Sequence, residues 1–227
     1  MTEPADMESM SVTKPSLIGQ RRAAANSDSS AAYQQRRKEI AEAAVRVFNS
    51  RGYKGASLSA VAADMGVDRA TLYYYFSSKD QLFDEITRSV IEENDALARR
   101  ITESQMNPNR KLRELVTALM TSYAANYPLL FIYIREDLAH VSDKRSEWSR
   151  EMRRLNRSIE QSVIGIIEQG FADGSFRRVG SARTVAYGIL GMLNWTHRWF
   201  RPDRSESPEE IGKVFAEMIL SGLESPY

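Results

Sequence analysis

The stretch between residues 52 and 82 constrains the fold of this chain most, because it encodes two short helices separated by a tight turn. Ser57 is placed to cap the first helix, and the apolar residues of Leu58–Met65 recur at i, i+3, i+4 and i+7. Gly66 is typical of a helix C-terminus, and Asp68 can cap the next helix after a single intervening residue. Two short helices joined in this way have the layout of a helix-turn-helix.

A third helix is predicted just before this stretch, over residues 33–50. The apolar residues of Ile40–Phe48 fall at i, i+3, i+4, i+7 and i+8, which places them on one face of a helix. Leu72 and Phe76 are four residues apart, so they direct one apolar face of the later helix toward the other two. The three helices are therefore expected to share one small core that ends near residue 77.

Helical periodicity continues through the rest of the chain, and no alternation typical of β-strands interrupts it. Ser78 and Gln81 form a capping-box pattern at the start of the first long segment. The sequence therefore predicts an all-α protein in two parts, a helix-turn-helix domain over 31–77 and a helical domain over 78–227. The helices expected in the second part span residues 78–104, 108–126, 129–140, 145–172, 180–200 and 208–223.

The basic residues of the chain are concentrated around the helix-turn-helix. Residues 33–79 carry eight Lys or Arg against four Asp or Glu, although the whole chain has a formal net charge of only +1. A helix-turn-helix with an excess of positive charge is suited to the phosphates of double-stranded DNA. Duplex DNA is therefore the expected partner.

Residues 1–30 are rich in Ser, Ala and Met, and they lack sustained periodicity. This composition is typical of an arm that is disordered when free. Two interpretations stay open for its basic residues Lys14, Arg21 and Arg22. They belong to a solvated tail, or they reach a DNA minor groove as some N-terminal arms do.

Composition argues against a membrane protein and against most classes of enzyme. The longest apolar run is the six residues 129–134, far short of the ~18 that a membrane-spanning helix needs. The start of the chain lacks a signal-peptide profile, so a cytoplasmic location is expected. The chain has no Cys and two distant His, which leaves no thiolate site, no cysteine nucleophile and no histidine-rich metal site. Because no Gly-rich phosphate loop or other catalytic motif is present either, we expect neither a cofactor nor an enzyme.

The side chains that face DNA follow from the helical rotation of about 100° per residue, with Leu72 directed to the core. Arg69 lies in the first turn and is long enough to reach a guanine, so we expect it to be the main base reader. Ala70 admits a thymine methyl, and the Thr71 hydroxyl can serve a base or a phosphate. Tyr75 belongs in part to the core. The outward face consists of Ala70, Thr71, Tyr73 and Tyr74, and the tyrosine hydroxyls suit phosphates at the groove edge.

Two helix N-termini add to this face, because free backbone amides attract phosphate. Ser57 and Ser59 begin one helix, and Lys79 begins the next long helix and adds a positive charge. Alternatively, Ser57 and Ser78 only cap their helices and Lys79 is a solvated surface lysine. Their joint occurrence around one recognition helix favours the phosphate-binding interpretation.

Seven short motifs in this region belong together. They are Gly52-Tyr53, Ser57-Leu58, Val61-Ala62, Gly66-Val67, Thr71-Leu72-Tyr73, Tyr75-Phe76 and Ser78-Lys79-Asp80-Gln81-Leu82. This set resembles the DNA-binding signature of the tetracycline-repressor (TetR) family of transcriptional regulators, over about residues 34–85. The chain departs from the family pattern at Ala56, Met65 and Asp68, and Asp68 brings a negative charge close to phosphate.

The resemblance implies a homodimer in which each subunit places its third helix in a major groove of a near-palindromic operator. It also implies a C-terminal domain that binds a small-molecule effector, so that the regulator, as a repressor, releases its operator when the effector binds. The DNA contacts implied by motif position come from Ser57, Ser59, Arg69, Ala70, Thr71, Tyr73, Tyr74, Tyr75 and Lys79. An alternative is a helical ligand-binding or adaptor protein that keeps the head without reading DNA.

The last two helices are the expected dimer interface. Two glycines three residues apart, Gly188 and Gly191, let another helix approach closely. In the TetR family two C-terminal helices from each subunit form a four-helix bundle, which agrees with this placement. The alternative is that these residues belong to the core of one subunit. The residues assigned to the interface are Gly188, Gly191, Met192, Val214, Phe215, Met218 and Ile219.

An effector pocket is expected among the helices of the second domain, where aromatic and polar residues interrupt apolar segments. The segment from Asn194 to Pro202 is similar to the end of the eighth helix in family members that respond to acyl-CoA thioesters. By that similarity Arg198 and Arg201 would meet the phosphates of coenzyme A. Most of the candidates are equally compatible with ordinary core or surface positions. The candidates are Tyr123, Tyr127, Phe131, Tyr133, Trp148, Asn156, Trp195, His197 and Arg198.

Overall fold

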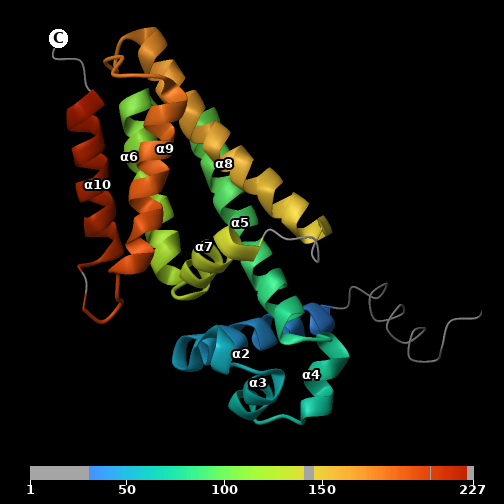
Figure 1. Cartoon of the computed structure of the whole chain (residues 1–227). Helices are drawn as coiled ribbons and strands as arrows, with labels where there is room; N and C mark the ends of the chain where they lie inside the picture. The colour runs from blue at the N-terminus through green and yellow to red at the C-terminus, as the bar shows by residue number, and fades with distance from the viewer. Residues whose placement is uncertain (1–30, 141–145, 205, 224–227) are drawn as a thin grey trace, which may run out of the picture.

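The computed structural model describes residues 31–140, 146–204 and 206–223, and helices dominate all three ranges (Figure 1). No β-strand occurs among these described residues, so the all-α prediction is confirmed. The arm proposed for residues 1–30 and the break expected at residues 142–143 lie outside the described residues. None of the described helices combines the length and the apolar character that a bilayer span requires.

The first three described helices form a compact head at the bottom of Figure 1. They are α2 (Ala31–Gly55), α3 (Leu58–Met65) and α4 (Arg69–Tyr75). α2 runs further than the predicted 33–50, but Gly52 breaks its regular geometry with a φ of 67° and a ψ of 168°. A positive φ is costly for residues with a Cβ, so glycine allows the chain to turn here toward α3.

Side-chain caps fix the ends of α3 and α4 as the sequence predicts. The Ser57 hydroxyl accepts a hydrogen bond from the Ala60 amide at 3.1 Å, and the Asp68 carboxylate accepts one from the Ala70 amide at 2.8 Å. Gly66 adopts a left-handed φ of 64° and ends α3. The Ser57 and Asp68 side chains satisfy amides that the first turn of each helix leaves free, and the Gly66 amide donates to carbonyls at the end of α3. Together these contacts hold the two helices at a tight turn.

The helical second part agrees closely with the predicted ranges, except at α9. The predicted helix over 180–200 ends at Trp195 and continues as a 3₁₀ turn. The Thr196 hydroxyl donates to the Leu193 carbonyl at 2.6 Å, and a ring nitrogen of His197 lies 2.7 Å from the Asn194 carbonyl. These side chains occupy carbonyls near the helix end, which favours termination. The elements are α5 (Lys79–Glu103), α6 (Pro108–Ala125), α7 (Leu129–His140), α8 (Ser146–Asp173), α9 (Ala182–Trp195), η2 (Thr196–Arg198) and α10 (Pro208–Leu223).

The helix α5 belongs to two hydrophobic clusters. Near its start, Leu82, Phe83 and Ile86 pack with the core of the head and with apolar residues of α7 and α8. Near its end, Ala98 and Ile101 pack with α6, the later part of α8, α9 and α10. Figure 1 shows α5 rising from the head into the upper domain, where α8 lies alongside it. The head is therefore joined to the second part through a continuous apolar core.

Gly212 of α10 lies close to the backbone of α6. A Cβ at this position would lie 2.8 Å from the Cα of Thr117 on α6. We predict that Gly212→Ala lowers the free energy of unfolding by about 1–3 kcal/mol, because overpacking forces the two helices apart. Urea denaturation at fixed protein concentration measures the change.

The control is Gly222→Ala on the same helix, where a Cβ would meet no atom within 4 Å. Because alanine favours helices, this variant should be as stable as the wild type or slightly more stable. A Gly212→Ala protein that matched the control would contradict the described packing of α6 against α10.

Candidate nucleic-acid interface and ligand cavity

The helix α4 presents one polar aromatic face to solvent and buries the other. Leu72 and Phe76 are buried in the head, as their i, i+4 spacing predicts. Tyr73 and Tyr74 are exposed by 38% and 45%, and Arg69 is exposed as well. Ala70 is also exposed, whereas Thr71 and Tyr75 are only partly exposed. The burial of Leu72 and the exposure of Ala70, Tyr73 and Tyr74 agree with the expected rotation of this helix, whereas Thr71, expected on the outward face, is partly buried.

Arg69 is held along the exposed face by Tyr73, one helical turn away. One guanidinium nitrogen of Arg69 donates to the Tyr73 hydroxyl at 2.8 Å, and the guanidinium carbon lies 5.0 Å from the centre of the tyrosine ring. A guanidinium has five N–H donors, so this bond leaves donors for another acceptor. The pair places a planar cation on the outer surface of α4, and a guanidinium in such a position can donate two hydrogen bonds to the edge of a guanine.

A cluster of three tyrosines fixes the end of α4. The ring of Tyr33 on α2 lies 5.1 Å from that of Tyr75 and 6.3 Å from that of Tyr74. The Tyr74 and Tyr75 rings are themselves 5.0 Å apart in an edge-to-face arrangement. Such pairs stabilise one relative orientation. Tyr33 was not predicted to take part, because nothing in the local sequence relates it to Tyr74 and Tyr75, which lie far along the chain.

The N-terminal residues of α3 and α5 are the other residues expected to contact DNA. Ser57 and Ser59 are exposed at the start of α3. Lys79 is half-buried, because its ammonium donates to the Tyr53 carbonyl at 2.9 Å and lies 4.4 Å from the centre of the Tyr53 ring. The Tyr53 hydroxyl in turn contacts the Asp80 carboxylate. Lys79 therefore has a fixed position at the start of α5.

Ion pairs within the chain neutralise part of the excess positive charge of the head. Arg36, Arg37 and Arg46 each form an ion pair, with Glu39, Glu85 and Asp64 respectively. The remaining exposed cations pair with no acidic residue in the described part of the chain. They are Lys38, Arg51, Lys54 and Arg69.

A cavity of about 360 Å³ lies in the second part of the molecule, among α5, α6, α7, α8 and α9. Two hydrogen bonds cross its wall, from the Tyr123 hydroxyl to Asn194 at 2.9 Å and from the Asn156 amide to the Tyr133 hydroxyl at 2.7 Å. Burial raises the pKa of Tyr123 to about 12, so this phenol stays neutral and donates. The lining residues are Ile91, Asn94, Leu119, Tyr123, Leu130, Tyr133, Ile134, Asn156, Ile159, Glu160, Tyr187, Leu190, Gly191 and Asn194.

Of the residues predicted for a pocket, Tyr123, Tyr133 and Asn156 line this cavity. The structure places the others elsewhere. Tyr127 and Phe131 pack against Phe200, with ring centres 6.1 Å from it in both cases. Trp148 stacks edge-to-face on Tyr133, whereas Trp195 is exposed beneath the guanidinium of Arg198, and His197 contacts the Asn194 carbonyl.

Sequence reasoning missed the polar lining residues Asn94, Glu160 and Asn194. Asn94 is 3% exposed and stands in the apolar stripe of α5, between Ile91 and Ala98. An amide on the buried face of an amphipathic helix is unusual, since a buried polar group needs a partner. That irregularity is the signal by which the sequence could have indicated Asn94.

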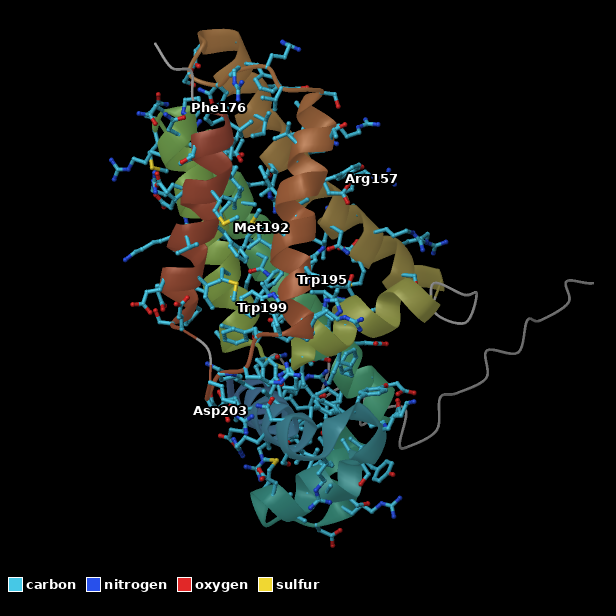
Figure 2. All side chains as sticks on the ribbon, turned by 60° about the vertical axis from the view of Figure 1, so that its left-hand side comes forward. Arg157, Phe176, Met192, Trp195, Trp199 and Asp203 are labelled. Carbon is cyan, nitrogen blue, oxygen red and sulfur yellow. The ribbon has the colours of Figure 1, made fainter. Side chains whose placement is uncertain are left out.

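The helices α9 and α10 present an apolar face that no other helix among the described residues covers. Trp195 and Met218 are exposed by 58% and 59%, and Val214 by 51%. Figure 2 shows Met192, Trp195 and Trp199 on this face. A Cβ added at Gly188 or Gly191 would meet no described atom within 4 Å, so neither glycine serves a close contact in the part of the chain that the structure describes. Phe215 and Ile219 are partly buried.

Comparison with known proteins relates both parts of the chain to one family. A family model described as "Bacterial regulatory proteins, tetR family" matches residues 40–86. A second, described as "Tetracyclin repressor-like, C-terminal domain", matches residues 105–223. The HTH-type transcriptional repressor KstR2 of Rhodococcus jostii (strain RHA1) is 29% identical over 193 residues, which cover 85% of this chain and 93% of the repressor.

Solved structures have the same fold. The TetR family transcriptional regulator PfmR from Thermus thermophilus is 30% identical, with a TM-score of 0.72 over 82% of this chain and 99% of that chain. AibR, solved in complex with isovaleryl coenzyme A and operator DNA, is 22% identical, with a TM-score of 0.64 over 81% of this chain and 97% of that chain. At this lower identity the likeness to AibR concerns the fold alone.

The cap of α4 generates a testable prediction, because Asp68 places a negative charge beside the face that would meet phosphate. Asp68→Asn keeps a capping oxygen for the Ala70 amide and removes the charge. We predict that this variant binds a DNA duplex about two- to fivefold more tightly at low salt, with the gain shrinking as salt rises. Fluorescence anisotropy at two salt concentrations measures the affinity of each protein for the duplex.

Asp68→Ala is the matched variant, since it removes the same charge together with the cap. It should lose about 1 kcal/mol of stability. Weaker DNA binding by a folded Asp68→Asn protein would mean that the carboxylate itself contacts the DNA.

Proposed function

Because the chain belongs to the TetR family of bacterial regulatory proteins, we propose that it is a sequence-specific DNA-binding repressor that a small-molecule effector releases from its operator. The observation that carries the proposal is the outer face of α4, where Arg69 and Tyr73 are held together on a helix anchored by Leu72. Its relatives are transcriptional regulators and not enzymes, which agrees with the absence of catalytic motifs in the sequence. A regulator of bacterial DNA would act in the cytoplasm.

In the proposed complex α4 enters the major groove. Arg69 reads a guanine, Ala70 allows close approach, and Thr71 serves a base or a phosphate. The hydroxyls of the α4 tyrosines and the flanking helix N-termini hold the phosphate backbone. The proposed contacts are Ser57, Ser59, Arg69, Ala70, Thr71, Tyr73, Tyr74, Tyr75 and Lys79. Tyr75 is the least exposed tyrosine of the three, so its role is mainly to orient its neighbours.

The proposed functional unit is a homodimer formed through the apolar face of α9 and α10. A two-fold axis would bring two copies of α4 to successive major grooves, about 34 Å apart. Exposed Trp195, Val214 and Met218 support this choice, since side chains of this kind gathered on one face mark an interaction site. The small surface at Gly188 and Gly191 would let the partner's helices approach closely.

The cavity is the proposed effector site. It offers a largely apolar lining with several amide and phenol groups and the carboxyl group of Glu160, which suits an apolar molecule that carries a few hydrogen-bonding atoms. An acyl-CoA thioester is the proposed class, because AibR was solved with isovaleryl coenzyme A. Asn194 lines the cavity four residues before Arg198, and both Arg198 and Arg201 are exposed. The acyl group would occupy the cavity, and the phosphates would meet these arginines outside it.

Release of DNA follows from linkage. An effector weakens DNA binding only if it prefers a dimer in which the two copies of α4 no longer match successive grooves. A ~100-fold effect requires about 2.7 kcal/mol of differential affinity. The helix α5 would transmit the effect of the effector to the head, since it contributes Ile91 and Asn94 to the cavity and its first residues to the core of the head.

Arg69→Ala tests DNA reading. A duplex is first selected from a randomised pool by the wild-type protein. We predict that the variant loses about 10- to 100-fold of the preference for this duplex over a scrambled one, since a bidentate base contact contributes about 1–3 kcal/mol. Gel-shift titration at fixed salt measures both affinities.

Arg51→Ala removes the same charge from an exposed position of the head and serves as the control. It should weaken binding to both duplexes slightly and equally. If the wild-type protein enriched no sequence at all, the alternative of a helical ligand-binding protein that retains the head would be favoured.

Met218→Glu tests the dimer. Placing a charge on the proposed interface should convert the wild-type dimer to a folded monomer at micromolar concentration, because a buried unpaired charge is costly. Sedimentation velocity gives the mass, and circular dichroism checks the fold. Ala63→Glu, on the exposed surface of α3, adds the same charge elsewhere and should stay dimeric. A dimeric Met218→Glu protein would place the interface on another surface.

A further inference from the structure

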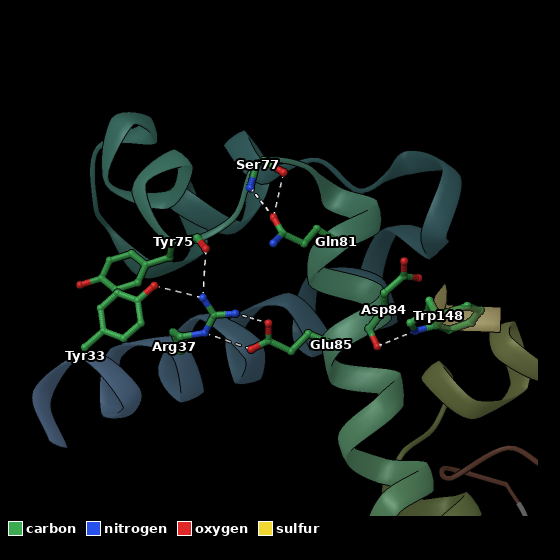
Figure 3. Close-up of polar contacts among 8 residues, drawn as sticks. All are labelled: Tyr33, Arg37, Tyr75, Ser77, Gln81, Asp84, Glu85 and Trp148. Atoms are coloured by element: carbon green, nitrogen blue, oxygen red, sulfur yellow. Dashed lines mark hydrogen bonds and ion pairs between the residues drawn. The ribbon is translucent and has the colours of Figure 1, made fainter. Parts of the chain in front are cut away.

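A single arginine connects the recognition helix to α5. Arg37 on α2 faces the Glu85 carboxylate with two guanidinium nitrogens, one of them at 3.1 Å, and its third nitrogen donates to the Tyr75 carbonyl at 3.2 Å (Figure 3). The same third nitrogen lies 3.2 Å from the Tyr33 hydroxyl. One side chain therefore contacts the last residue of α4 and the second turn of α5.

The surroundings of Arg37 favour a fixed position. Its side chain is 17% exposed, and the guanidinium carbon lies 4.4 Å from the centre of the Phe76 ring. Burial lowers the pKa of Arg37, but the hydrogen bonds and charges of Glu85 and Tyr33 outweigh it, so the pKa is raised above its ordinary value. A planar guanidinium that forms a two-point pair with a carboxylate has little freedom to turn.

The contact with Tyr75 matters because α4 has only seven residues. The last carbonyls of a helix lack intrahelical partners and carry partial negative charge. A cation at this end therefore stabilises the helix and determines where the end lies. Since Leu72 fixes the middle of α4 in the core, the position of the end sets the direction of the outer face.

The same turn of α5 is also connected to the wall of the cavity, through Trp148. The Trp148 indole on α8 donates to the Asp84 carbonyl at 3.2 Å, and Asp84 is the neighbour of Glu85 (Figure 3). The Trp148 ring lies 6.1 Å from the Tyr133 ring in an edge-to-face contact. Tyr133 lines the cavity and accepts the hydrogen bond from Asn156.

We propose that Arg37 is a positioning residue for DNA reading, which sets the direction of α4 from α5, and that Trp148 ties the same turn of α5 to the cavity wall. This inference rests on the proposed function of the chain as a DNA-binding regulator. A change at Tyr133 or Asn156 then reaches α4 through Trp148, the turn at Asp84 and Glu85, and Arg37. Arg37 acts through Glu85 and Tyr75, without contact to a phosphate.

The salt dependence of DNA binding separates this role from a phosphate contact. Arg37→Gln should weaken binding to the selected duplex about three- to thirtyfold and leave the slope of log K against log salt unchanged. A phosphate-binding arginine would lower the magnitude of the slope by nearly one unit on removal. The matched control is Arg36→Gln on the same helix, whose ion pair with Glu39 is local, and its affinity should change less than twofold.

The fraction of active protein is obtained by stoichiometric titration, so that a variant that folds poorly is not mistaken for one that binds weakly. Glu85→Gln, which breaks the same pair from α5, should reproduce the Arg37→Gln result. Equal affinities of wild-type and Arg37→Gln proteins, or a slope reduced by one unit, would overturn the positioning role.

A second measurement needs no DNA, and so it distinguishes failure of this inference from failure of the proposed function. The chain has no Cys, so spin labels at Ala70→Cys on α4 and Gln161→Cys on α8 report the distance between the recognition helix and the second part. Labelled protein is diluted into excess unlabelled protein, so that only one subunit of a dimer is labelled. The doubly labelled protein without any further substitution should give one narrow distance distribution.

Arg37→Gln and Trp148→Phe should each broaden that distribution, whereas Arg36→Gln should not. Trp148→Phe keeps a smaller aromatic ring near Tyr133 and removes the indole donor to the Asp84 carbonyl. Distributions that stayed as narrow as the wild type in both variants would overturn the connection through α5. Broadened distributions in a protein that enriched no DNA sequence would keep the connection and refute the DNA-reading function.

Discussion

The burial of α5 in two hydrophobic clusters is the constraint on which the rest of the structure depends. Its first turns place Leu82, Phe83 and Ile86 in the cluster that holds the head together, and its last turns place Ala98 and Ile101 in the cluster of the upper helices. Each fully buried side chain of the larger kind contributes roughly 1.5–3 kcal/mol. No single polar contact at the junction matches that sum, so α5 and the head must move together or separate at considerable cost.

This arrangement explains why the polar contacts near Glu85 matter for the orientation of α4 rather than for the stability of the fold. Apolar packing is close to non-directional, and it permits small rotations of the seven-residue α4 about Leu72. Hydrogen bonds with defined geometry, such as those of Arg37 and Trp148, select one orientation among those that the core allows. Because the cavity borders the same helix at Ile91 and Asn94, the proposed effector would act on the orientation of α4 through α5.

The local structure was readable from the sequence, whereas the contacts between distant segments were not. Ser57, Gly66 and Asp68 act within a few residues of themselves, so their capping roles follow from spacing alone. The pair of Arg69 and Tyr73 is also local, and its i, i+4 spacing could have indicated it. Arg37 and Glu85 are 48 positions apart, and the cavity gathers side chains from five helices. Periodicity shows which face of a helix is buried, but not which other helix it meets, and therefore Asn194 and Tyr187 were not predicted to share a cavity with Asn94.

The central claim is that DNA binding by α4 and occupancy of the cavity oppose each other through α5. The most direct measurement extracts small molecules from the folded protein, identifies them by mass spectrometry, and titrates the one that binds back into the purified dimer. Calorimetry gives its affinity with and without the selected duplex, and anisotropy gives the affinity for the duplex with and without the molecule. The two affinities should fall by the same factor, since a coupling free energy is reciprocal. A saturated cavity with an unchanged duplex affinity would contradict the account.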